Sequence, residues 1–264
     1  MDFNLFLEKI PLFYLYIITA AAVFLSIMIG YRLGNYIQNR RKSTKEAKIG
    51  SIVGAMLGLL AFILAFTFGA ATSRFDDKKQ LLLDEVNAIG TTFLRTDFLT
   101  ESERAEAKML LKKYVNLRVS ILKNPKLLPQ VIIESENIQN ILWSQVSSVS
   151  NKQVDPVLLG LYVQSLNEVI DLHTKRVTVG LQYRIPGSIW MTLYFITVLT
   201  MLAVGYEFGL NGVGSILISS ILALAFSAFI ILIADLDRGV AGTLQVSQKP
   251  LIELQQKLNN SLDK

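Results

Sequence analysis

Four long stretches of the chain contain no charged residue, and polar segments separate most of them. The stretches cover residues 11–31, 50–73, 185–206 and 208–234. A helix needs about 20 apolar residues to cross the hydrocarbon core of a bilayer. Inside lipid, a helix also satisfies the hydrogen bonds of its own backbone. The pattern therefore predicts an all-α integral membrane protein built on a bundle of four transmembrane helices.

The segment between the second and third stretches has a different, water-soluble composition. Residues 74–184 hold 15 basic and 13 acidic side chains. Helices are expected over 101–122, over 129–146, and from a side-chain cap at Asp155 and a first-turn Pro156 to about Thr178. Apolar residues at helical spacing predict that the second span continues out of the membrane as one long helix; they are Phe75, Leu82, Val86, Ile89 and Phe93.

These patterns divide the chain into four parts. Residues 1–73 form a first transmembrane hairpin with a basic connecting loop, and residues 74–184 form a helical extramembrane insert. Residues 185–234 form the second hairpin, and residues 235–264 form a tail with an amphipathic helix. That helix should begin near Pro250, with an apolar face of Leu251, Leu254, Leu258 and Leu262.

Small residues recur every four positions on several spans. One row is Gly50, Gly54 and Gly58; another is Ser215, Ser219, Ala223 and Ser227; Gly30 and Gly34 form a shorter pair. Such faces let helix backbones approach closely in lipid. They predict helix packing within the bundle, or alternatively a subunit interface or a pore-lining seam. The serine row suits the second reading because its hydroxyls could contact water.

Charged residues cluster where two spans leave the membrane. Arg74, Asp76 and Asp77 follow the second span, and Asp235, Asp237 and Arg238 follow the fourth. Arg74 is expected to pair with one of the two later aspartates, and Arg238 with one of the two earlier ones. These charges either anchor the helix ends or form a vestibule or ion-binding ring. A calcium site at Asp235 and Asp237 is a further alternative, with weak support because calcium takes six or more oxygen ligands.

Composition excludes several kinds of chemistry. The chain has no cysteine and one histidine, His173, so a disulfide framework, a thiolate zinc site and a histidine zinc site are excluded. His173 is interpreted as a surface or interface residue. No catalytic motif is present, so no enzyme activity and no cofactor are expected. Without a basic run interleaved with aromatics, nucleic acid is not an expected partner, and spans without ionisable groups argue against proton-coupled transport.

Charge also bears on orientation. The loop at residues 32–49 holds six basic residues and one acidic residue. Short basic loops tend to stay in the cytoplasm, which predicts that both termini and the insert lie outside.

Two stretches resemble a known family. The first reads TSRFDDKKQL at residues 72–81 and continues with EVNAIGTTFLR at 85–95. The second reads DLDRGVAG at 235–242 and continues with VSQKPL at 246–251. Both are similar to a bacterial membrane family of unknown function that is described as bestrophin-like (DUF4239). Gly239 stands where that family's pattern has proline.

The resemblance implies a subunit similar to bestrophins, which are pentameric anion channels. It implies a homo-oligomer in the bacterial inner membrane, with the termini and insert in the cytoplasm, opposite to the charge prediction. The bestrophin neck is apolar and comes from the second helix, which makes Leu60, Leu64 and Phe68 a candidate pore constriction. The alternative is a membrane-anchored sensor or scaffold whose helical insert binds a protein partner.

Overall fold

The chain folds into helices that form two compact units. A computed structural model describes residues 10–40, 49–149, 154–212, 214–238 and 242–262. Unit 1 comprises residues 1–75 and 184–244, and unit 2 comprises residues 76–183 and 245–264. Most of the basic loop, residues 41–48, and Gly239 lie outside the described residues, as do the predictions that rest on them.

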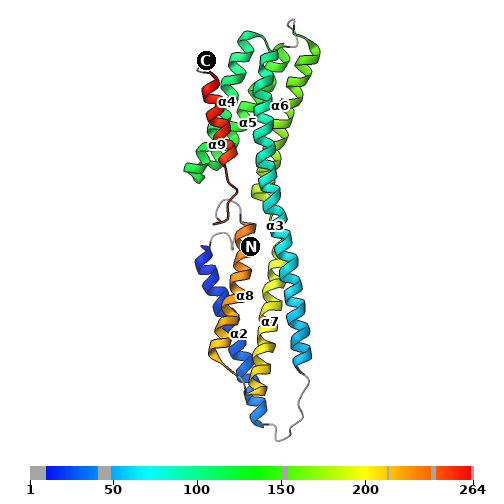
Figure 1. The fold of residues 1–264 in the computed structure, drawn as a ribbon, viewed down its shortest axis with the longest axis vertical. Helices are drawn as coiled ribbons and strands as arrows, with labels where there is room; N and C mark the ends of the chain where they lie inside the picture. Colours follow the sequence, from blue (N-terminus) through cyan, green and yellow to red (C-terminus); the bar gives the residue numbers. More distant parts are fainter. Residues whose placement is uncertain (1–9, 41–48, 150–153, 213, 239–241, 263–264) are drawn as a thin grey trace. The chain divides into compact units, whose positions relative to one another are not determined.

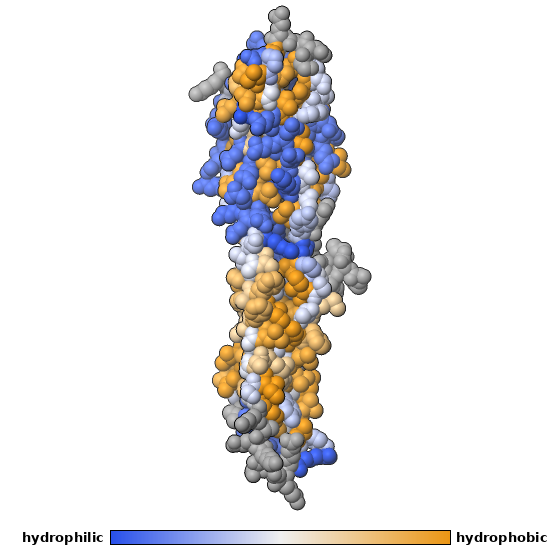
Figure 2. Space-filling view, turned by 90° about the vertical axis from the view of Figure 1, so that its right-hand side faces the viewer, coloured by the Kyte–Doolittle hydropathy of each residue, from blue (hydrophilic) through white to orange (hydrophobic). Residues whose placement is uncertain are grey.

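Unit 1 contains the four predicted membrane spans. All four helices are long and apolar enough to cross a bilayer, which confirms the predicted fold class. Much of the surface of this unit is apolar (Figure 2). In Figure 1 the helices are α2 (Leu12–Arg40), the first part of α3 (Ile49–Arg95), α7 (Gly187–Asn211) and α8 (Ile216–Asp237).

Glycines bring α2 and α7 into backbone contact. A Cβ atom on Gly205 would overlap the carbonyl oxygen of Ile27, and one on Gly30 would overlap that of Leu202. Gly34 and Gly209 stand one turn further along and would meet backbone atoms in the same way. Each helix thus contributes a pair of glycines four residues apart to one close crossing, as expected for small-residue packing in lipid.

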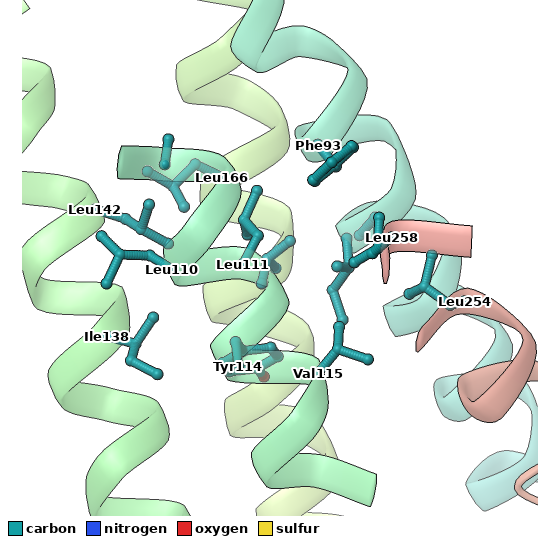
Figure 3. Packing of buried hydrophobic residues seen from close by; sticks show 14 of the residues in the cluster. Phe93, Leu110, Leu111, Tyr114, Val115, Ile138, Leu142, Leu166, Leu254 and Leu258 are labelled. Carbon is teal, nitrogen blue, oxygen red and sulfur yellow. The ribbon is translucent and has the colours of Figure 1, made fainter. Parts of the chain in front are cut away.

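Unit 2 is a bundle of amphipathic helices around one apolar core. Figure 3 shows Leu110 and Leu111 pointing toward side chains from the neighbouring helices, including Leu142 and Leu166. The helices are the remainder of α3, α4 (Glu101–Lys123), α5 (Leu128–Val149), α6 (Pro156–Val177) and α9 (Lys249–Leu262).

The two ends of α6 and the packing of α9 complete the description of unit 2. Asp155 caps α6 by accepting hydrogen bonds from the backbone N–H groups of Val157 and Leu158, which confirms the predicted start. A π-helical turn, Thr178–Gln182, follows α6. Leu254 and Leu258 of α9 are buried in the core of unit 2 (Figure 3), so this helix packs with the helices of the insert.

Candidate pore face and charged clusters

One face of α3 is open along the whole membrane span. Of the residues in its apolar window 17% are buried, against 28–33% in the other three spans. Phe62 and Phe66 are 69% and 65% exposed. We define the open α3 face as the exposed residues that recur at three- and four-residue spacing: Ala55, Gly58, Phe62, Phe66, Gly69 and Ser73.

The predicted constriction points the other way. Leu60 is fully buried and Leu64 is 5% exposed, and both belong to the core of unit 1. Phe68 is half-buried, with its ring centroid 5.6 Å from that of Phe229. Because successive residues turn 100° around a helix, Leu60 and Leu64 lie roughly opposite the open α3 face. Leu60 and Leu64 thus pack inside unit 1 and do not belong to its exposed face.

The rows of small residues have different surroundings. A Cβ atom on Gly50 would lie 2.8 Å from Oε1 of Glu207, whereas one on Gly54 or Gly58 would have no described atom within 4 Å. On α8, Ser219, Ala223 and Ser227 are buried inside the bundle. Ser215 caps α8, and its Oγ accepts a hydrogen bond from the backbone N–H of Ile218. The serine row thus faces inward within one chain, while Gly54 and Gly58 are open.

Asp237 ties three segments of unit 1 together. Its Oδ1 accepts a hydrogen bond from the backbone N–H of Ile185 at 2.9 Å and pairs with Nη1 of Arg74 at 3.3 Å. Its carbonyl oxygen accepts from Nη1 of Arg184 at 3.1 Å. The expected pairing of Arg74 with an aspartate of the fourth span is therefore present. A carboxylate held in this way braces the exit of α8 against α3 and against the start of α7.

The other charged residues of the two clusters have separate surroundings. Asp235 is buried and binds the backbone N–H groups of Thr243 and Leu244, at 2.7 and 3.2 Å, together with the hydroxyl of Thr243. Arg238 donates a hydrogen bond of 2.6 Å to the carbonyl oxygen of Ile10. Asp76 and Asp77 are exposed residues of unit 2. The described residues contain no group of three or more histidine or acidic side chains that could hold a metal ion.

Unit 2 holds a buried layer of polar side chains that crosses its helices. Glu85 of α3 is fully buried; its Oε1 accepts a hydrogen bond of 2.8 Å from the hydroxyl of Tyr114. Its Oε2 lies 3.5 Å from Nη2 of Arg118 and pairs with Nη1 of Arg176. Nδ1 of His173 lies 3.1 Å from the oxygen of Tyr114. We call the polar layer the set Glu85, Tyr114, Arg118, Gln139, His173 and Arg176.

The interpretation of His173 as a surface or interface residue was wrong, because the side chain is 2% exposed. One signal could have placed the layer inside the fold. Glu85 lies between Leu82 and Ile89 on one helical face, and His173 follows Leu166 and Val169 on another. A charged or titratable residue that interrupts an apolar stripe at helical spacing belongs to the stripe and is buried with it.

Burial perturbs the ionisation of the polar layer. Burial, with a smaller contribution from the guanidinium of Arg118, lowers the pKa of His173 to about 4. Burial also lowers the pKa of Arg176 to about 10 and raises that of Tyr114. At neutral pH His173 is thus uncharged and Arg176 is charged. The hydroxyl of Tyr114 donates its hydrogen bond to Glu85, so the Tyr114 oxygen is the acceptor towards His173. Nδ1 of neutral His173 is therefore the protonated ring nitrogen, which donates to Tyr114.

Unit 2 is expected to lose stability as the pH falls from about 6.5 to 4. In that window the unfolded chain binds a proton at His173 that the folded chain does not bind, so the free energy of unfolding falls. The loss amounts to at most about 3 kcal/mol, because one pKa unit corresponds to about 1.4 kcal/mol. Urea unfolding at several pH values, followed by fluorescence of Trp143 in a Trp190→Phe background, measures it.

The matched variant is His173→Asn, which keeps a donor near the position of Nδ1 and does not titrate. We expect the variant to show a smaller loss across the same pH window than the parent, since the remaining loss comes from carboxylates. Equal losses in the two proteins would show that the pKa of His173 is not lower in the folded protein than in the unfolded chain.

The fold and the clusters together define a multi-pass helical membrane protein with a second, helical unit. A family model described as the Bestrophin-like domain matches residues 17–251, and the chain belongs to this family. No curated protein matches the chain.

Three solved structures share the fold. An aspartate-to-alanine variant of a bacterial bestrophin homolog from Klebsiella pneumoniae is 14% identical, with a TM-score of 0.68 over 96% of this chain and 99% of that one. A leucine-to-threonine variant of the Klebsiella homolog gives 14% identity and a TM-score of 0.67 over the same shares. A membrane protein with a glycine-to-alanine substitution is 13% identical, with a TM-score of 0.68 over 96% and 97%.

Proposed function

We propose that the chain forms an oligomeric anion channel of the bacterial inner membrane, whose pore is lined by the open α3 face. The observation that carries this proposal is the exposure of that face. It presents two phenylalanines and several small residues in a row along an entire membrane span. The proposal assigns no catalytic chemistry to the chain.

The small residues of α3 support an oligomer. In this chain the glycines of α2 and α7 are where two helices touch through their backbones. Gly58 and Gly69 of the open α3 face offer the same chemistry, yet a Cβ atom on either would have no described atom of another helix within 4 Å. A face that meets only lipid gains nothing from small residues, whereas a helix of another subunit can approach it closely. A ring of subunits would use part of this face for contact and turn the rest toward a central pore.

Phe62 and Phe66 are the side chains that would form the constriction. One copy from each subunit would make an apolar ring, and such rings gate by loss of water from the pore. The helix exits carry charges of both signs: Arg74, Arg184 and Arg238 stand with Asp76, Asp77, Asp235 and Asp237. Acidic rings select cations and basic rings select anions, so anion selectivity is proposed on the family and not on these charges.

Chloride flux from liposomes that contain the purified protein tests the proposal. Phe66→Ala is expected to raise the flux about tenfold, equivalent to about 1.4 kcal/mol of barrier. The matched control is Leu64→Ala, which removes a core side chain, lowers stability and leaves the conductance per folded oligomer unchanged. Empty liposomes and a potassium-flux assay complete the comparison.

Two outcomes would contradict the proposal. A strictly monomeric protein in lipid would remove the ring of subunits. A folded oligomer without flux would favour the alternative, a scaffold whose second unit binds a protein partner.

A further inference from the structure

The charges of unit 2 are segregated along the chain. Residues 109–126, which cover the second half of α4 and the turn after it, hold five basic residues and no acidic one. Residues 127–172, which cover α5 and most of α6, hold five acidic residues and one basic residue. Interspersed charges of both signs are enough for solubility, so solubility alone does not explain this separation.

Four of these charges lie at the surface of α4 and α6. Lys113 is exposed and Lys112 is half-buried on α4, and Glu168 and Asp171 are exposed on α6. Within the described part of the chain, none of the four forms an ion pair. We call Lys112 and Lys113 the basic patch, and Glu168 and Asp171 the acidic patch. The acidic patch ends where Lys175 follows, one turn beyond Asp171.

The two patches stand at one level of the bundle and point in opposite directions. α4 and α6 run parallel, because short connections reverse the chain between α4 and α5 and again between α5 and α6 (Figure 1). Tyr114 and His173 meet in the core, 3.1 Å apart. Lys112 and Asp171 each precede one of these residues by two positions, so they share its level. Two positions turn a side chain by about 200° around a helix, so both side chains point away from the core.

We propose that unit 2 of one subunit binds unit 2 of the next subunit head to tail, with the basic patch of α4 against the acidic patch of α6. The inference rests on the proposed oligomer and assigns its contact outside the membrane. Subunits that stand side by side in one membrane share their orientation, so patches at one level on opposite sides of each copy can meet. Such a contact joins two different faces, and its repetition closes a ring.

Exposed apolar side chains accompany both patches. Met109 precedes the basic patch on the outer face of α4, and Val157 and Leu161 precede the acidic patch on the outer face of α6. Ion pairs between exposed side chains contribute little by themselves, whereas burial of these apolar groups adds hydrophobic stabilisation. The charges then determine which faces meet.

Cross-linking of introduced cysteines in the full-length protein, reconstituted in lipid, tests the contact. The chain has no cysteine of its own. Met109→Cys and Gln164→Cys place thiols at exposed positions beside the two patches and leave the four charged residues in place. With a short bifunctional maleimide, the double variant is expected to give a ladder of covalent oligomers, and each single variant is expected to give monomers only.

The native mass of the same samples separates this inference from the proposed channel. An oligomer by native mass that gives no ladder would overturn the head-to-tail contact and leave the oligomer standing. Cross-linked dimers from a single-cysteine variant would also overturn it, because they would show like faces in contact. A monomer by native mass would overturn both proposals.

Charge reversal in the double-cysteine background tests the two patches. Lys112→Glu together with Lys113→Glu is expected to lower the yield of the ladder about tenfold, because like charges then face each other. Glu168→Lys together with Asp171→Lys is expected to lower it equally. Since the four substitutions together exchange the signs of the two patches, they are expected to restore the ladder.

The matched control reverses two lysines outside the basic patch. Lys123→Glu together with Lys126→Glu makes the same change in charge at exposed positions, but Lys123 stands about three turns beyond Lys112. This pair is expected to leave the ladder unchanged. A full ladder from the variant with both patch lysines reversed, or a ladder that the four substitutions fail to restore, would contradict the assignment.

Discussion

Glu85→Gln is expected to lower the free energy of unfolding of unit 2 by about 3–5 kcal/mol. The substitution keeps the shape of the side chain and an oxygen that accepts the hydrogen bond from Tyr114. It removes the negative charge that faces Arg118 and Arg176, so two largely buried guanidinium groups lose their counter-ion. The loss follows from the charge left uncompensated in the interior and not from packing.

Urea unfolding followed at Trp143, with Trp190 replaced by phenylalanine, measures this effect. Asp97→Asn is the matched control, because it also removes an acid that pairs with basic side chains, Lys108 at 2.7 Å and Arg104 at 3.9 Å. Asp97 is 55% exposed at its side chain, so its loss should cost less than about 1 kcal/mol. Similar losses in the two variants would mean that Glu85 is not a buried counter-ion.

Gly205→Leu is expected to prevent the packing of α2 against α7 and so the folding of unit 1. Even the first carbon of the new side chain would overlap the carbonyl oxygen of Ile27, and a backbone atom cannot rotate away as a side chain can. Separating the helices would forfeit the contacts of Gly30, Gly34 and Gly209 as well. The loss of these contacts outweighs the gain in helix stability of about 1 kcal/mol that comes from replacing a glycine.

The yield of monodisperse protein and the fluorescence of Trp190, which is buried on α7, report this effect. Gly160→Leu is the control, since a Cβ atom at this exposed helical position would have no described atom within 4 Å. We expect the control to fold as the parent does. Normal folding of Gly205→Leu would exclude the α2–α7 crossing in the register described.

The sequence was sufficient for the positions of the helices because each depends on a local signal. Charge-free windows identify the spans, since a charge in hydrocarbon is costly whatever surrounds it. Asp155 and Pro156 identify the start of α6, since a cap acts on the residues that follow it. The continuation of α3 beyond the membrane follows from its apolar spacing. None of these features needs a contact between distant parts of the chain.

The sequence was not sufficient for the direction in which each face of a span points. Leu60 and Leu64 are four residues apart, and so are Phe62 and Phe66; both pairs are apolar. In a soluble helix the apolar face turns inward, but lipid is as apolar as the bundle core, so hydropathy does not distinguish the two sides. The same ambiguity explains why the serine row of α8 was a candidate for contact with water although Ser219 and Ser227 are buried.

The polar layer required a different kind of information. Its charged members come from three helices, and although Glu85 stands within an apolar stripe, the spacing alone does not tell which basic side chains meet it. The layer becomes recognisable when Glu85, Arg118 and Arg176 are brought within reach of one another by packing. A buried ion pair is therefore a property of the tertiary fold, and sequence spacing can at most mark its members as candidates.

The accessibility of single cysteines on α3 tests the central claim most directly. The chain contains no cysteine, so each introduced thiol is unique. In reconstituted protein, a charged thiol reagent that cannot cross lipid should modify Phe66→Cys and block chloride flux, because water reaches the open α3 face through the pore. It should leave Leu64→Cys unmodified. Rapid modification of Leu64→Cys with no reaction at Phe66→Cys would place the pore on the opposite face and contradict the account.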